Sequence, residues 1–306
     1  MHPIARLRQL LDSPGVVVAP GAYDVLSALI IEREDFPAVY LGGAAVTGSF
    51  LGLPDVGIIT MSEIVQVARN VAFAVNIPII SDAETGFGNS TNIRRTVREF
   101  EGAGVAGIHI EDQACPKRCG HFEGKSVIPI VDMQQKIRAA SEARENTDFV
   151  IIARCDAIAV EGFEAALARG QAYVEAGADM LFIECPRSVK EVEDIAHRFR
   201  DQIPLFFNMA ETGKTPYIPA QKLGEIGYKL VVYPEPARLV AAKGIIEVMR
   251  ELKRTGSTAG VKDKMIPYLE YTELVGLPEV QALEHRYGTE PGRIPGFQSG
   301  EHPIIA

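Results

Sequence analysis

The chain has 306 residues, of which 47% are hydrophobic and 23% are charged, and its formal net charge is −9. This composition is typical of a globular protein with a large core, built as one large α/β domain or two small ones. The acidic balance argues against nucleic acid as the main partner. No segment reaches the roughly 20 apolar residues that span a bilayer, so we expect no membrane association.

A short apolar segment followed by a helical stretch recurs along the chain. The apolar segments span residues 15–20, 38–43, 77–84, 105–112, 148–156, 178–185, 203–211 and 228–235. Such strands alternating with helices predict a parallel sheet covered by helices. Eight units over about 235 residues match a (β/α)8 barrel, which needs ~250 residues. A doubly wound open sheet is the alternative.

Regions outside the eight units complete the predicted organisation. Residues 1–15 read as an amphipathic helix and a turn rather than a signal peptide. We expect the barrel to occupy residues 1–255, further helices residues 256–288, and a Gly/Pro-rich tail residues 289–306. The four cysteines are too few for a disulfide framework, which favours a reducing, cytoplasmic compartment.

Polar residues gather at the carboxyl ends of the predicted strands, where barrel enzymes place their active sites. They are Tyr40, Gly42, Gly43, Asp82, Glu84, His109, Glu111, Arg154, Asp156, Glu184, Asn208, Glu211 and Tyr233. One such residue is ordinary capping, whereas a ring of them predicts a site.

Three acids in this ring predict a metal site. Asp82, Glu84 and Glu111 end adjacent strands, and carboxylates without thiolates suit Mg²⁺, with Mn²⁺ as an alternative. The period of two places Asp82 and Glu84 on one strand face. The alternatives are helix capping or salt bridges to Arg94 and Arg95.

Other members of the ring are candidates for binding a carboxylate substrate. Arg154 can hold a carboxylate in a bidentate fork or pair with a neighbouring acid. His109 can bind a carboxylate or support an acid, and Asn208 suits a carboxylate or hydroxyl. The loop at residues 40–55 brings Gly42, Gly43 and Ala44 close to an anion. Asp55, in the same loop, could reach the metal through water.

The stretch "CPKRCGHFEGK" at residues 115–125 admits three interpretations. A zinc knuckle lacks a fourth ligand, and a Cys115–Cys119 disulfide does not suit a reducing compartment. The favoured interpretation is a Gly-flanked loop that presents one thiol, with Lys117 and His121 nearby. Cys155 and Cys185 lie at apolar strand ends and are expected to serve packing alone.

Several motifs together resemble the isocitrate lyase/phosphoenolpyruvate mutase superfamily. They are "HIEDQ" followed by "KRCGH", with "LGLPD", "GFG", "YVEAGADMLF" and "GKTP". Within it, the chain is similar to the 2-methylisocitrate lyase and 2,3-dimethylmalate lyase branch, and also to carboxyphosphonoenolpyruvate phosphonomutase. The resemblance implies a (β/α)8 barrel whose last helix is swapped between subunits, in a homotetramer made of two helix-swapped dimers.

The resemblance also implies roles for individual residues. Cys119 matches the catalytic cysteine, and Asp82 and Glu111 match the Mg²⁺-site acids. Positions that line the substrate or metal site are matched by Tyr40, Gly43, Asp55, Lys117, Gly120, His121, Arg154, Glu184 and Asn208. The chain departs from the family at Glu84, usually Asp, at Gly42–Gly43–Ala44, at Cys155 in "ARCDA", and at Pro236 and Arg238.

These features predict a Mg²⁺-dependent lyase that cleaves a 2-hydroxy di- or tricarboxylate into an α-keto acid and a carboxylate. Cys119 is expected to protonate the departing enolate, and Tyr40 to accept the hydroxyl proton. Arg154 and His121 complete the predicted catalytic set. The rivals are a phosphonate P–C mutase or hydrolase, an oxaloacetate hydrolase or decarboxylase, and a non-catalytic metabolite-binding barrel.

Overall fold

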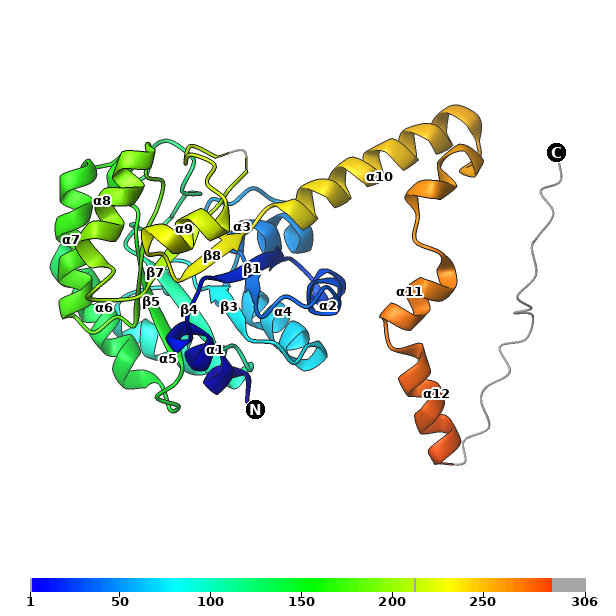
Figure 1. Cartoon of the computed structure of the whole chain (residues 1–306), viewed down its shortest axis with the longest axis horizontal. Coiled ribbons are helices and arrows are strands. Elements are labelled where there is room, and N and C mark those ends of the chain that lie inside the picture. Colours follow the sequence, from blue (N-terminus) through cyan, green and yellow to red (C-terminus); the bar gives the residue numbers. More distant parts are fainter. Residues whose placement is uncertain (1, 212, 288–306) are drawn as a thin grey trace. The chain divides into compact units, whose positions relative to one another are not determined.

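A closed barrel of parallel strands forms the body of the protein. The computed structural model describes residues 2–211 and 213–287. Within them, strands pair in chain order from β1 to β8, and β8 closes the barrel against β1 (Figure 1). The strands are β1 Val17–Ala22, β2 Val39–Leu41, β3 Ile79–Asp82, β4 Gly107–Glu111, β5 Val150–Cys155, β6 Met180–Ile183, β7 Leu205–Asn208 and β8 Leu230–Tyr233. Each falls within or overlaps a predicted segment, which confirms the predicted (β/α)8 barrel.

Helices alternate with the strands, and those between β1 and β8 lie on the outside of the barrel (Figure 1). The α-helices of the described residues are α1 Pro3–Asp12, α2 Val25–Arg33, α3 Gly43–Val46, α4 Met61–Ala74, α5 Ser90–Gly102, α6 Ile130–Ala143, α7 Phe163–Glu175, α8 Val189–Phe199, α9 Ala220–Ile226, α10 Pro236–Thr255, α11 Tyr268–Leu274 and α12 Leu277–Arg286. Helix α1 is the predicted N-terminal helix, and its apolar residues Ile4, Leu7 and Leu11 are buried. In the described part of the chain, none of the helices is both long enough and apolar enough to cross a membrane.

Aromatic rings fill the interior of the barrel below its carboxyl end. Tyr40 of β2, His109 of β4, Phe182 of β6 and Phe206 of β7 come from strands that are not all neighbours. Each ring nevertheless lies 4.4–6.1 Å, centroid to centroid, from at least two of the others. Such contacts require the side chains to point inward. The next inward positions along β4, β5 and β7, which are Glu111, Arg154 and Asn208, therefore stand above a packed floor.

The chain divides into two compact units, residues 1–250 and 251–306. The first contains the barrel, and the division falls inside α10, five residues before the predicted boundary at residue 255. The second unit carries α11 and α12, in the region where further helices were predicted. The predicted tail, residues 289–306, lies outside the described residues.

Candidate active site

A pocket opens at the carboxyl ends of the strands. It is lined by Tyr40, Gly42, Gly43, Ala44, Ala45, Asp55, Asp82, Cys119, Gly120, His121, Arg154, Glu184, Asn208, Ala210, Pro234 and Glu235. Tertiary structure thus gathers most of the predicted site residues around one cavity. Glu84, His109, Glu111 and Lys117 do not line it, and each is buried directly beside a lining residue. Of the other predicted strand-end residues, Asp156 contacts the lining residue Arg154, whereas Glu211 and Tyr233 lie outside the pocket lining.

Asp82 and Glu84 approach each other through a turn. Strand β3 ends at Asp82, and Glu84 follows with a left-handed backbone (φ +54°). The prediction that both lie on one pleated strand face is therefore wrong. The Glu84 N–H donates to Asp82 Oδ1 (2.7 Å), and the Gly43 N–H donates to Asp82 Oδ2 (3.1 Å). Both carboxylates thus lie beneath Gly43, at the start of α3.

Lys117 reaches into this acidic cluster from the "CPKRCGHFEGK" loop. Its Nζ lies 2.5 Å from Asp55 Oδ1 and 2.9 Å from Glu84 Oε2, and its side chain is only 3% exposed. Burial raises the pKa of Glu84 to about 8 against the opposing effect of Lys117. Burial also favours a higher pKa at Asp82, but His109, Lys117 and Arg154 together lower it to about 2.

Arg94 and Arg95, the partners considered for these acids, pair with other residues. Arg94 lies 3.6 Å from Glu142, and Arg95 lies 3.4 Å from Glu99. Both pairs are on the outer surface of the molecule, so the salt-bridge alternative for the site acids does not describe this structure.

Arg154 is held between two acids above the aromatic floor. Its Nη1 lies 3.2 Å from Glu111 Oε2, and its Nε lies 2.9 Å from Asp156 Oδ2. Burial raises the pKa of Glu111 well above its usual range, although Arg154 and Lys117 oppose this. Arg154 thus pairs with neighbouring acids, which was the alternative to substrate binding. Its guanidinium nevertheless lines the pocket, and the two ion pairs orient it there.

Tyr40 and His109 form a buried hydrogen-bonded pair. The Tyr40 hydroxyl lies 2.8 Å from His109 Nε2, and His109 Nδ1 lies 3.6 Å from Asp82 Oδ1. Burial lowers the pKa of His109 to about 4, so its imidazole is neutral. Burial and the Asp82 charge raise the pKa of Tyr40 well above its ordinary value. His109 therefore supports Tyr40 from below the pocket.

The loop at residues 112–129 covers one side of the pocket and delivers Cys119. The Cys119 N–H donates to the Asp55 carbonyl (3.1 Å), and Lys125 Nζ donates to the Gly120 carbonyl and contacts Asp156. All four cysteines are free, and Cys115 is exposed. Burial raises the pKa of the Cys119 thiol. The loop therefore presents a protonated thiol to the pocket.

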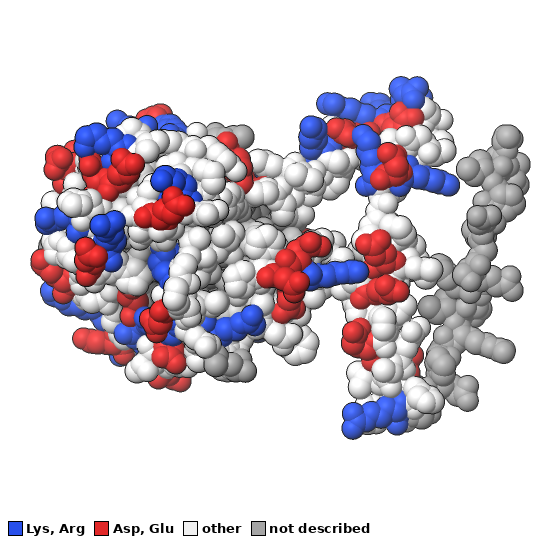
Figure 2. Space-filling view, in the orientation of Figure 1, with Lys and Arg blue, Asp and Glu red and all other residues white. Residues whose placement is uncertain are grey.

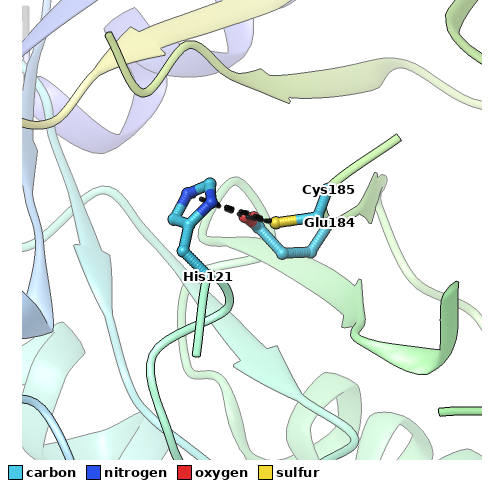
Figure 3. Close-up of side chains that lie close together, drawn as sticks. All are labelled: His121, Glu184 and Cys185. Atoms are coloured by element: carbon cyan, nitrogen blue, oxygen red, sulfur yellow. Dashed lines mark hydrogen bonds and ion pairs between the residues drawn. The ribbon is translucent and has the colours of Figure 1, made fainter. Parts of the chain in front are cut away.

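Cys185 was expected to serve packing alone, and the structure contradicts this. Its Sγ lies 3.0 Å from Glu184 Oε1 and 3.4 Å from His121 Nδ1 (Figure 3). Asn208 Nδ2 donates to both Glu184 oxygens at 3.3 Å. Cys155, in contrast, is fully buried in β5, as predicted.

Residues after β8 also border the pocket. The resemblance placed Pro236 and Arg238 near the substrate, whereas sequence reasoning assigned Pro234 and Glu235 no role in the site. Pro234 and Glu235 line the pocket, and Arg238 forms an ion pair with Glu235 and donates to the Ala44 carbonyl (3.3 Å). Pro236 is the first residue of α10, a position where its fixed φ and missing N–H are tolerated. Sequence reasoning could have found Glu235, because it is the last residue of the predicted strand 228–235 and barrel active sites lie at strand ends.

Comparisons with known proteins agree with this geometry. The family model described as phosphoenolpyruvate phosphomutase matches residues 7–253. The chain is 44% identical to 2,3-dimethylmalate lyase of Eubacterium barkeri, covering 94% of this chain and 99% of the relative. It is 46% identical to 2-methylisocitrate lyase of Aeropyrum pernix, covering 88% and 86%. A solved phosphonopyruvate hydrolase in complex with oxalate and Mg²⁺ superposes with a TM-score of 0.85 at 32% identity, covering 94% and 99%.

Proposed function

Because the chain belongs to the phosphoenolpyruvate phosphomutase family, we propose that it is a Mg²⁺-dependent carbon–carbon lyase. Its substrate would be a 2-hydroxy di- or tricarboxylate similar to 2-methylisocitrate or 2,3-dimethylmalate, cleaved to an α-keto acid such as pyruvate and a carboxylate. Two relatives above 40% identity are named for these reactions. The observation that carries the proposal is the protonated Cys119 thiol facing the same pocket as Arg154 and the buried acids.

The acids beside the pocket fit a hard divalent cation. Glu84 Oε1 and Glu111 Oε1 are buried and have no hydrogen-bond partner among the described residues. Lys117 and Arg154 offer two positive charges to four acids, Asp55, Asp82, Glu84 and Glu111, and a bound cation would favour the ionised forms of Glu84 and Glu111, whose pKa values burial raises. Oxygen donors with uncompensated charge suit Mg²⁺, and Mn²⁺ is an alternative.

Asp82, Glu84 and Glu111 would hold Mg²⁺ largely through water. The ligand atoms of these three acids do not all lie within 4.8 Å of one another. In the described part of the chain, the trio that does is His121, Glu184 and Cys185. The wider spacing of the three acids suits an ion that keeps several of its waters. When bound, Mg²⁺ would stabilise the negative charge that develops on the 2-hydroxyl oxygen.

Arg154 would bind and orient the substrate carboxylate. Glu111 and Asp156 fix its guanidinium by contacts of 3.2 and 2.9 Å, so little freedom is lost when substrate binds. The loop glycines, Gly42 and Gly43, bring backbone close to the same carboxylate, and Ala44 extends that wall. Asn208, Glu184 and His121 line the opposite side for the remaining polar groups of the substrate.

Cys119 would donate the proton that completes cleavage. Breaking the C–C bond leaves an enolate of the departing carboxylate, and the thiol proton transfers to its carbon. Tyr40 is a weaker candidate for the base than predicted, because accepting a proton requires a phenolate and its raised pKa opposes ionisation. We therefore assign Tyr40 the role of a hydrogen-bond donor to the hydroxyl oxygen, and the hydroxyl proton would pass to a carboxylate that lines the pocket, Asp82 or Glu184.

Closure of the 112–129 loop would exclude water from the enolate. Lys117 holds the loop against the site acids, and Lys125, in the same loop, contacts Asp156 after β5. We place the activity in the cytoplasm, which the free thiols of all four cysteines support. The face of the barrel in Figure 2 carries Lys, Arg, Asp and Glu interspersed, in keeping with a small-molecule carboxylate rather than nucleic acid as partner.

A substrate screen tests the proposed function. 2-Methylisocitrate, 2,3-dimethylmalate, isocitrate and 2-alkylmalates are incubated with the full chain and Mg²⁺, and pyruvate or another α-keto acid is measured. We expect turnover that chelation abolishes and Mg²⁺ restores. Parallel reactions with phosphonopyruvate, followed by ³¹P NMR, and with oxaloacetate, followed by oxalate release, test the rivals. Faster turnover of either rival substrate would overturn the proposal.

A further inference from the structure

His121, Glu184 and Cys185 form a compact cluster with mixed ligand chemistry beside the catalytic pocket (Figure 3). Glu184 and Cys185 directly follow β6, and His121 comes from the 112–129 loop. One ligand atom from each lies within 4.8 Å of the others. Cys185 Sγ is 3.0 Å from Glu184 Oε1 and 3.4 Å from His121 Nδ1, and His121 Nε2 is 3.6 Å from Glu184 Oε1.

The 3.4 Å distance between Cys185 Sγ and His121 Nδ1 fits a four-coordinate transition metal, and the 3.0 Å distance between Sγ and Glu184 Oε1 would have to lengthen when the ion binds. With metal–sulfur bonds of ~2.3 Å and metal–nitrogen or metal–oxygen bonds of ~2.0 Å, donors around a tetrahedral ion lie roughly 3.3–3.6 Å apart. A thiolate, an imidazole and a carboxylate form a donor set typical of zinc, whereas Mg²⁺ prefers oxygen alone. The cluster is therefore chemically distinct from the oxygen-only acids Asp82, Glu84 and Glu111.

The backbone directs the Cys185 thiol into this cluster. Cys185 has a left-handed backbone (φ +57°), a conformation that is strained for a residue with a side chain and is common at functional sites. Its side chain is buried against the Gly120 carbonyl, 3.5 Å away. A cysteine needed only for packing would not require this conformation.

The imidazole of His121 is also positioned by its surroundings. The Lys214 N–H donates to Nδ1 (3.2 Å), and a Cβ on Gly213 would lie only 2.4 Å from the ring. Its Nε2 is buried and has no hydrogen-bond partner among the described residues. Because Nδ1 accepts the hydrogen bond from Lys214, the lone pair of the neutral ring is on Nδ1, 3.4 Å from the Cys185 thiol, and a small ring movement makes it available to a cation.

We propose that His121, Glu184 and Cys185 form a binding site for a thiophilic divalent cation such as Zn²⁺, with water as the fourth ligand. On binding, the Cys185 S–H proton is released to solvent and the thiolate coordinates the metal. Since His121 and Glu184 also line the catalytic pocket, an ion there excludes the substrate. Inhibition of the enzyme by the ion rests on the proposed lyase function, whereas the existence of the metal site does not.

Cobalt spectroscopy on the full chain tests the site without measuring activity. Co²⁺ is added in the presence of excess Mg²⁺. We expect a thiolate-to-cobalt charge-transfer band, the visible bands of four-coordinate cobalt, and loss of both when Zn²⁺ is added. Cys185→Ala should remove the charge-transfer band and weaken Zn²⁺ binding at least ~100-fold, because losing a ligand costs more than losing an outer-shell partner.

Matched thiol variants identify the ligand. Cys119→Ala and Cys155→Ala should keep the band, and His121→Ala should weaken it. A wild-type protein without the band, or a band that depends on Cys119, would overturn the site. The cleavage rate of each variant is measured with and without Zn²⁺, and inhibition is given as the ratio of the two rates, so that a lower rate caused by the substitution itself is not counted as inhibition. An intact cobalt band without inhibition would leave the site standing and remove its link to the proposed activity.

Discussion

Cys119 depends for its chemistry on where the loop places it. An exposed thiol would be partly ionised near its usual pKa of ~8.5. In the pocket, burial raises the pKa of Cys119, and the Asp55 and Glu184 charges act in the same direction. A group with a raised pKa keeps its proton to higher pH, so the folded site holds the acid form that protonation of an enolate requires.

The fall of kcat at high pH tests the role of Cys119 as a general acid. We predict that kcat stays constant up to a pH above ~8.5 and falls only as pH rises through the raised pKa of Cys119. Cys119→Ser, whose hydroxyl does not ionise in this range, should be slower by ~10²-fold or more and lack this fall. Binding of a non-cleavable substrate analogue should stay within a few-fold of wild type. Unimpaired cleavage by the serine variant would contradict the general-acid role.

At the scale of elements, the start of α3 and the end of β3 depend on each other. The Gly43 N–H caps Asp82, and the carboxylates of Asp82 and Glu84 occupy the space that a side chain on Gly43 would fill. The absence of a side chain at Gly43 therefore leaves room for the carboxylate of Glu84.

Gly43→Ala tests this arrangement. The new Cβ would lie 2.2 Å from Glu84 Oε1 and 2.8 Å from Asp82 Oδ2, so both acids must move. We predict at least a ~10-fold loss of kcat/KM, since displacements near 1 Å at a site are costly, and a higher Mg²⁺ requirement, with thermal unfolding little changed.

Gly48→Ala is the matched control in the same segment. Its Cβ would lie 3.7 Å from the nearest atom, Arg238 Nη1, which is ordinary contact. Equal activity of the two variants would show that the space beneath Gly43 does not position the acids.

At the scale of the whole molecule, α10 lacks the packing that the other barrel helices have. None of its residues is buried, and Val240, Ile245 and Met249 are more than half exposed. An apolar groove lies beside its first residues, lined by Val18, Pro20, Gly21, Ile31, Phe36, Ala220, Tyr233, Pro236 and Ala237. We infer that this groove receives α10 of a second copy in a helix-swapped dimer, two of which form a tetramer.

Charges on α10 should prevent this assembly. We predict that Val240→Glu with Ile245→Glu shifts the protein to a monomer in sedimentation velocity, because burying two carboxylates costs far more than the apolar contact they replace. Lys243→Ala, an exposed change on the same helix, should leave the mass unchanged. A monomeric wild-type chain would contradict the inference, and so would an assembly unaffected by the two glutamates.

The sequence by itself determined the barrel and most of the pocket. Apolar strands that alternate with helices are buried in a parallel sheet covered by helices, and eight such units match a closed barrel, in which the carboxyl ends of the strands meet at one rim. For this reason Tyr40, Asp82, Arg154, Glu184 and Asn208 could be assigned to one site from their positions alone.

Only the tertiary structure decided which side chains pair within that rim. The turn after β3, not the strand period, brings Glu84 to Asp82, and Lys117 joins them from a distant loop. From the sequence, Cys185 was predicted to be a packing residue. In the structure, its left-handed backbone places the thiol next to His121. Backbone turns and contacts between distant segments carry no periodic signal, so these pairings follow from the fold and could not be read from the chain.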